Sequence, residues 1–127
     1  MQKYYKHWSL VPKEEWFWPN FTPKELASKG NGSVLIDYDA MYRLQIMRNI
    51  IGKPFHITSA YRDPLHNARV GGSPNSFHKK GKAFDISLAG HTKRELKKAA
   101  TAVGFGGIAF ARSFIHVDTG RRRTWTY

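Results

Sequence analysis

The sequence predicts a single α+β domain over residues 1–127, in which helices pack on one face of a small, mostly antiparallel sheet. Helix-start signals and apolar side chains at helical spacing occupy residues 22–52, and short alternating segments cluster later in the chain. Helices combined with clustered short strands are typical of this fold class. The chain has 127 residues with 41% hydrophobic content, which is enough for one buried core.

The composition limits the metal ligands and partners that the chain can use. Lys and Arg outnumber Asp and Glu by 21 to 9, and the formal net charge of +12 predicts attraction to a polyanion such as nucleic acid, anionic lipid or a cell-wall polymer. The chain has no cysteine, so a bound metal must rest on His, Asp or Glu. No window approaches the roughly 18 apolar residues of a membrane span. The first residues also lack the apolar core of a secretion signal.

The first fifth of the chain is expected to differ from the rest. Residues 1–20 are aromatic and basic, and we expect a loosely structured arm whose rings cover one edge of the core. A short helix follows, because Thr22 suits the N-cap, Pro23 the first helical position and Glu25 the capping box. This helix is expected to end near Lys29.

Two longer helices are predicted from their caps and apolar spacing. The first begins at Asp37 or Asp39 and is closed by Gly52, and its core face is Met41, Leu44, Met47, Ile50 and Ile51. The second covers residues 92–103, where Thr92 and Glu95 form a capping box.

Four short segments predict strands: residues 55–60, 82–88, 108–111 and 113–118. The last two are expected to pair through a turn near Arg112. Between the first two, the glycine-rich residues 67–76 predict a polar loop. The basic and aromatic tail after residue 120 has no predicted element.

Two histidines and one aspartate in separate segments predict an open metal site. His78 precedes the strand that contains Asp85, so a loop can fold the imidazole back over the carboxylate, and His116 must come from a neighbouring strand. Three protein ligands leave a fourth zinc position for water, as in catalytic zinc centres. Zinc lowers the pKa of such a water from about 15.7 to about 7.

Asp118 is placed beside this site by the alternation of its strand. Residues two apart in a strand share a face, so His116 and Asp118 point together while Ile115 and Val117 face the core. Asp118 is therefore either a general base or the group that orients a ligand histidine, and both roles stay open. A lone histidine on a strand usually binds nothing, and the prediction depends on the combination of residues.

The residues around the three expected ligands resemble the metal-binding pattern of the zinc D-Ala-D-Ala carboxypeptidase family, the LAS peptidases that cut peptidoglycan. The match is to the small phage and bacterial branch of murein endopeptidase K. It is carried by residues 114–120 and by Ser76, His78, Gly81, Ala83 and Asp85. Residues 59–62, 67–72 and 106–108 also fit, and the resemblance covers roughly residues 20 to 125.

The resemblance implies an LAS/hedgehog-type fold with one zinc ion on His78, Asp85 and His116. Arg62 lies sixteen residues before the first ligand and would hold a substrate carboxylate or a polarised carbonyl oxygen, for which a planar guanidinium is suited. Ser76 would contact substrate.

One position departs from the family pattern. Many members have an acidic residue three positions before the last ligand, where this chain has Ser113. A hydroxyl is too weak a base for this role, so Asp118 is the remaining candidate.

The expected function is hydrolysis of a D,D- or L,D-type peptide bond in peptidoglycan by a monomeric phage lysis enzyme. We expect it to be made in the cytoplasm, to reach the wall after holin-type release or as a virion component, and to be attracted there by its positive charge. Two alternatives remain: a catalytically silent zinc module like the hedgehog domain, and a nucleic-acid binder that uses residues 121–123, Trp125 and Tyr127. His56, His66 and His91 are expected to be exposed or to have local roles.

Overall fold

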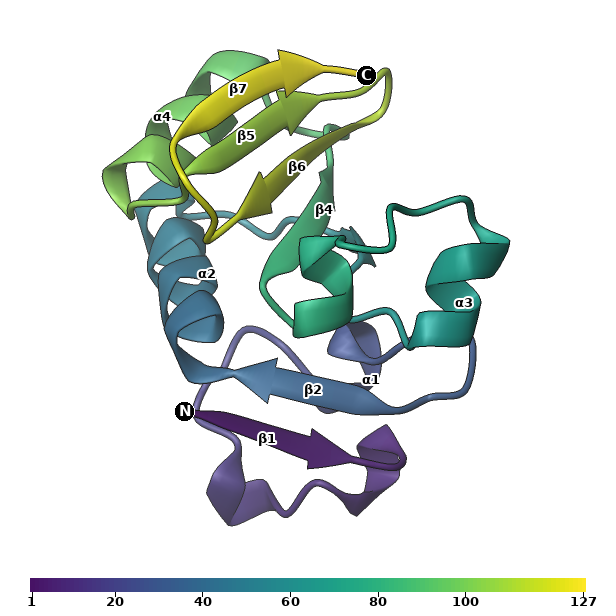
Figure 1. Ribbon diagram of the computed structural model, residues 1–127. Helices are drawn as coiled ribbons and strands as arrows, with labels where there is room; N and C mark the ends of the chain where they lie inside the picture. The colour runs from purple at the N-terminus through teal and green to yellow at the C-terminus, as the bar shows by residue number, and fades with distance from the viewer.

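Two β-sheets and four α-helices make up the computed structural model, which describes all residues from 1 to 127 (Figure 1). The larger sheet has the strand order β3-β4-β6-β5-β7. Its strands are β3 (Ile57–Ser59), β4 (Ala83–Ser87), β5 (Gly107–Phe110), β6 (Phe114–Asp118) and β7 (Arg123–Thr126). All neighbours are antiparallel except β5 and β7. The predicted α+β class is confirmed, but the sheet is mixed and larger than expected because the tail adds β7.

Helices α2 (Tyr38–Ile51) and α4 (Lys93–Ala102) cover one face of the larger sheet (Figure 1). As predicted, Met41, Leu44 and Met47 of α2 are buried, but Ile50 is 54% exposed and lies outside the core. Leu96, Ala99 and Ala100 of α4 form the facing apolar surface. These helices and the sheet therefore enclose the main core.

The helix ends follow the capping residues that the sequence contains. The Asp37 carboxylate accepts a hydrogen bond from the Ala40 N–H at 2.9 Å and starts α2, and Gly52 ends it with φ at 74°. Capping boxes at Thr22 and Thr92 start α1 (Pro23–Leu26) and α4, as predicted. Helix α1 ends at Leu26, three residues earlier than expected.

The expected loop over residues 67–76 begins inside a helix that we did not predict, α3 (Pro64–Arg69). The Asp63 carboxylate caps this helix by accepting from the His66 N–H at 3.0 Å, and Pro64 takes its first position. A 3₁₀ helix, η3 (Phe77–Lys80), follows and carries His78. The Asp-Pro pair was an available helix-start signal.

The N-terminal arm is ordered and was wrongly expected to be loose. Strand β1 (Gln2–Tyr5) pairs antiparallel with β2 (Val34–Asp37), and the 3₁₀ helices η1 (Trp8–Leu10) and η2 (Lys13–Glu15) follow. Trp18 is part of the hydrophobic core, in agreement with the expectation that the aromatic rings of this arm cover the core. The Gln2 side chain donates to the Lys80 carbonyl oxygen at 2.8 Å, so the small sheet contacts η3. None of the helices is both long and apolar enough to cross a bilayer.

Gly81 forms the turn between η3 and β4 and lies directly against β2. Its φ is 70°, a left-handed conformation that favours glycine. A Cβ atom at this position would lie 2.6 Å from the Leu35 backbone oxygen. This turn joins the segments that carry His78 and Asp85, so its conformation sets their relative position.

Substituting Gly81 should destabilise the protein more than substituting a glycine of equal backbone geometry. Gly81→Ala should lower the free energy of unfolding by more than about 2 kcal/mol, because the left-handed conformation costs about 1 kcal/mol and the clash with Leu35 adds to it. Gly71→Ala is the matched control, since its φ is 72° and no atom lies within 4 Å of the added Cβ. Urea unfolding of both variants measures the difference, and equal losses would contradict this account.

Candidate metal centre

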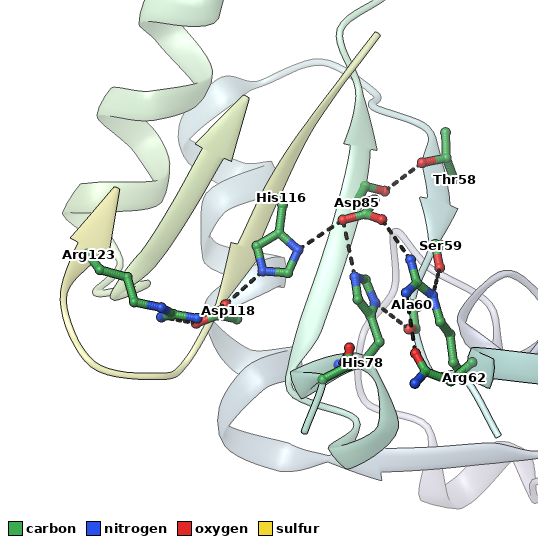
Figure 2. A network of polar contacts seen from close by, with 11 residues as sticks. Thr58, Ser59, Ala60, Arg62, His78, Asp85, His116, Asp118 and Arg123 are labelled. Carbon is green, nitrogen blue, oxygen red and sulfur yellow. Dashed lines mark hydrogen bonds and ion pairs between the residues drawn. The ribbon is translucent and has the colours of Figure 1, made fainter. Parts of the chain in front are cut away.

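The pairing of β4 with β6 places Asp85 directly opposite His116 (Figure 2). The same register sets Ala83 opposite Asp118. Directly opposite residues of an antiparallel pair project from the same face. On the other face of β6, Ile115 and Val117 are fully buried in the core. The predicted division of β6 into a polar face and a core face is therefore confirmed.

The three expected ligands converge on one point. His78 Nε2 lies 3.2 Å from Asp85 Oδ1, and His116 Nδ1 lies 3.1 Å from the same oxygen (Figure 2). One ligand atom from each residue lies within 4.8 Å of the others, and all three side chains are buried. Two ligands of a tetrahedral zinc, each about 2.0–2.1 Å from the ion, lie about 3.3 Å apart. The donor set and its spacing therefore fit a divalent ion of this kind.

The hydrogen bonds of the outer ring nitrogens identify which nitrogen of each histidine would bind an ion. His78 Nδ1 lies 2.7 Å from the Ala60 carbonyl oxygen, and His116 Nε2 lies 2.7 Å from Asp118 Oδ2. Because a carbonyl and an ionised carboxylate only accept, each of these nitrogens carries the proton. His78 Nε2 and His116 Nδ1 both face the Asp85 carboxylate, and they are the nitrogens that would give up a proton when a cation binds between them. Metal-binding histidines usually have such a partner on the outer nitrogen.

Asp118 is fully buried, and four donors surround its carboxylate. Oδ1 accepts from the Gly120 N–H at 2.9 Å and from Arg123 Nη1 at 2.9 Å. Oδ2 accepts from Arg123 Nη2 at 2.8 Å and from His116 Nε2. A carboxylate has about four acceptor positions, so none remains for a proton from water. Of the two roles left open by the sequence, this geometry favours orientation of His116.

The Arg123 side chain extends from β7 over Gly107 of β5 to reach Asp118 on β6. In the sheet, Gly107 of β5 is the register partner of both Asp118 and Arg123, and a Cβ atom there would collide with both side chains. The Arg123 guanidinium also lies 5.2 Å from the Phe77 ring centroid and 4.8 Å from that of Trp125. Arg123 was not among the predicted site residues. The alternation of residues 123–127 was an available strand signal that would have placed Arg123 and Trp125 on one face.

Next to His116, the aromatic side chains of Phe114, Trp125 and Tyr127 form a wall of the cleft. Ala109 of β5 lies between His116 and Trp125 in register, and the rings of the latter two are 5.3 Å apart. Tyr127 lies 6.4 Å from the His116 ring and 5.6 Å from that of Phe114. The residues of the alternative nucleic-acid patch are therefore not a free tail, because Arg123 binds Asp118 and Trp125 packs against His116.

Arg62 and Ser76 both line the cleft of about 450 Å³ above the three ligands. Arg62 Nη2 lies 3.3 Å from Asp85 Oδ2, and its Nε donates to Ser59 Oγ at 3.0 Å (Figure 2). The Ser76 hydroxyl accepts from the His78 N–H at 3.2 Å and caps η3. Ser113 is exposed in the turn between β5 and β6 and does not line the cleft.

The three histidines that were expected to be exposed or to have local roles lie outside this group. His56 is exposed, and His66 lies half-buried in α3. The buried His91 ring contacts the Pro54 carbonyl oxygen at 2.9 Å and the Glu95 carboxylate at 3.3 Å. Their surroundings agree with the expected exposed or local roles.

The carboxylates of the site are ionised at neutral pH despite their burial. Burial raises the pKa of Asp85, but hydrogen bonds from His116 and His78 outweigh it and lower the pKa to about 2. Burial also raises the pKa of Asp118, but hydrogen bonds from His116 and Arg123 outweigh it and lower this pKa to about 2. Burial lowers the pKa of His116, yet its bonds to Asp118 and Asp85 raise it overall. Asp85 thus offers an ionised carboxylate to a cation.

Residues 19–118 match the sequence profile of the family described as Peptidase M15. This chain belongs to the peptidase M15 family. The family that the motifs predicted, with its zinc carboxypeptidase and murein endopeptidase members, is therefore confirmed. The profile ends at Asp118, so Arg123 lies outside the matched range.

Three curated relatives show what the M15 chain is similar to. The peptidoglycan L,D-endopeptidase MepK of Escherichia coli K12 is 33% identical over 97 residues, which cover 69% of this chain and 52% of the relative. A probable MepK of Haemophilus influenzae is 33% identical over 95 residues, with 69% and 51% covered. The zinc D-Ala-D-Ala carboxypeptidase of Streptomyces albus G is 33% identical over 92 residues, with 68% and 36% covered. The chain therefore spans about half the length of the MepK relatives.

Zinc binding should depend on His78, Asp85 and His116, and not on the other histidines of the chain. The wild-type protein should retain one zinc ion per chain after dialysis, and His116→Ala should retain none. Asp118→Ala should weaken zinc binding by about 10- to 100-fold, because the outer partner of His116 is lost. The exposed His56→Ala variant should behave as wild type. Elemental analysis and titration calorimetry measure these values, and zinc retained by His116→Ala would contradict the site.

Acid should destabilise the metal-free protein between about pH 4 and pH 2. The pKa values of Asp85 and Asp118 are about 2 in the folded chain and ordinarily 3.8, so their stabilising contribution is present above pH 4 and is lost as the pH falls through 2. Each carboxylate accounts for about 2 kcal/mol of the free energy of unfolding. Urea unfolding of chelated protein over this pH range measures the loss. In Arg123→Met the loss should be smaller, and an unchanged pH dependence would show that Arg123 does not hold Asp118 ionised.

Proposed function

We propose that this protein is a zinc-dependent peptidase that hydrolyses a peptide bond of bacterial peptidoglycan. The observation that carries the proposal is the convergence of His78 Nε2, Asp85 Oδ1 and His116 Nδ1 in a cleft, while an outer hydrogen bond holds the other nitrogen of each ring. Membership of the M15 family supports peptide hydrolysis. The relatives named as peptidoglycan endopeptidase and zinc D-Ala-D-Ala carboxypeptidase support the substrate and the metal.

In this proposal His78, Asp85 and His116 hold one zinc ion. Bound zinc supplies Lewis-acid polarisation of a carbonyl and a water of lowered pKa. The Ala60 carbonyl holds the His78 ring, and Asp118 holds the His116 ring. These contacts keep both imidazoles in the tautomer that a cation requires.

Arg62 is the residue proposed to bind substrate at the cleft. Its Nε and Nη2 are held by Ser59 and Asp85, which fixes the plane of the guanidinium beside the metal centre. A fixed fork can bind a peptide carboxylate through two parallel hydrogen bonds or stabilise charge on a carbonyl oxygen. The wall of Phe114, Trp125 and Tyr127 faces the same space and would contact the apolar parts of a stem peptide. Ser76 remains a weaker candidate, because its hydroxyl already caps η3.

Asp118 is proposed as a positioning residue and not as the general base. Its four acceptor positions are occupied, and it is fully buried. Asp85 and Asp118 are the two carboxylates that line the cleft, and both are engaged in the centre. This observation favours a second candidate function, a module that binds zinc without turnover.

A lytic role in phage infection belongs to the same proposal. The net charge of +12 would concentrate the protein on walls that carry anionic polymers, whether it is released through a holin or carried on a virion. Protein added to cells with exposed walls should then lower their turbidity.

Digestion of purified peptidoglycan tests the peptidase proposal. Mass spectrometry should show muropeptides shortened or separated at one type of peptide bond, and chelation should abolish and zinc restore the activity. Arg62→Lys should keep its zinc and lose about 10- to 100-fold in kcat/KM, because the lysine keeps the charge and loses the fork. The exposed Arg69→Lys is the matched control. Zinc-loaded protein that leaves all muropeptides unchanged would favour the silent module.

A further inference from the structure

The positive charge of the chain is concentrated in its second half. Residues 64–127 contain 12 Lys and Arg against 3 Asp and Glu, whereas residues 1–63 contain 9 against 6. Two of those three carboxylates, Asp85 and Asp118, are buried in the metal centre. Glu95 is therefore the one carboxylate that this half of the chain presents at its surface, and it is paired with Lys53.

Helix α4 carries four exposed cations without ion-pair partners: Lys93, Arg94, Lys97 and Lys98. They occupy positions i, i+1, i+4 and i+5, which gives two rows on one face with about 6 Å between successive members along the axis. Lys93 and Arg94 lie in the first turn, where the helix dipole disfavours positive charge. The helix dipole therefore does not account for the placement of Lys93 and Arg94.

The cationic face of α4 lies on the core-covering side of the larger sheet, and the metal cleft lies on the other side, with the edge strand β7 between them. Arg94, Lys97 and Lys98 line a shallow groove of about 490 Å³. Lys97 also lines a hollow of about 300 Å³ along the edge strand β7, and Trp125 lines both this hollow and the metal cleft. In Figure 1, α4 lies beside β5 and β7 at the end of the molecule opposite β1. We name this path from α4 to Trp125 the α4 groove.

We propose that the α4 groove binds a phosphodiester polymer attached to the bacterial cell wall, across the edge strand β7 from the cleft that binds the peptide. The two rows of unpaired cations match a chain with repeated negative charge, and each neutralised phosphate releases a counterion. The choice of a wall polymer rests on the proposed function, because a wall that carries such a polymer presents it on the same scaffold as the peptide substrate. Electrostatic binding at the groove would hold the cleft close to its substrate.

Two other polyanions fit this surface less well. The apolar side of α4 is buried, and none of the exposed large hydrophobic residues lies on this helix, so an anionic membrane would gain no inserted anchor. Single-stranded nucleic acid needs free aromatic faces for base stacking. Here the Phe110 ring has the Lys93 ammonium 5.6 Å from its centroid, and Trp125 packs against Arg123 and His116.

Binding of the full chain to purified walls tests this proposal. The test variant is Lys97→Gln with Lys98→Gln. The matched control is Lys6→Gln with Lys29→Gln, which removes the same charge from exposed, unpaired lysines in the other half of the chain. The dissociation constant for intact walls should rise about 10- to 30-fold in the test variant and less than about threefold in the control. Walls stripped of their phosphodiester polymer by hydrofluoric acid should bind wild type at least as weakly as intact walls bind the test variant, because stripping removes the partner of all four cations.

Three results would overturn the proposal: equal weakening in both variants, binding unaffected by stripping, or tighter binding to a DNA duplex than to intact walls at equal phosphate concentration. Hydrolysis of a soluble muropeptide without polymer separates this proposal from the peptidase function. The test variant should cleave that muropeptide at the wild-type rate. Absence of cleavage by wild type would refute the peptidase proposal and leave the binding result standing.

Discussion

The antiparallel register of β4 against β6 is the constraint on which the metal centre depends. It sets Asp85 opposite His116 and leaves Ile115 and Val117 in the core. Because strand side chains alternate, a slip of one residue would send both polar side chains to the other face. The fully buried Ile86, Ile115 and Val117 oppose such a slip, since it would move them out of the core. The same packing that stabilises the fold thus positions two of the three ligands.

Burial of charge is the second requirement that the site has to meet. Two carboxylates and two imidazoles lie out of water beside one another, and each needs a partner to offset its desolvation. Asp118 obtains one from the bidentate Arg123 guanidinium, which Gly107 allows to reach across β5. Asp85 obtains one from Arg62, which also faces the cleft. The outer contacts therefore stabilise the centre before any ion binds, and they orient the ligands for one.

The features that could be predicted from the sequence are those that depend on local signals and on motif spacing. The caps at Thr22, Asp37 and Thr92 satisfy backbone groups of their own helices, so short-range chemistry is enough to locate them. The site residues were found from their types and from resemblance, and the structure brings His78, Asp85 and His116 together. The sequence left the role of Asp118 open because the choice depends on Arg123, whose position is set by a parallel pairing of β7 with β5. Pairings between distant strands, such as β1 with β2, likewise have no local signature in either partner.

Nitrogen-15 NMR of the imidazoles in zinc-loaded protein tests the central claim most directly, because it reports which ring nitrogen of each histidine binds the ion. The hydrogen bonds to Ala60 and Asp118 predict opposite modes, with His78 bound through Nε2 and His116 bound through Nδ1. Zinc should therefore shift the Nε2 resonance of His78 and the Nδ1 resonance of His116, while each outer nitrogen keeps its proton. Coordination of both rings through the same type of nitrogen, or resonances that zinc leaves unchanged, would contradict the account.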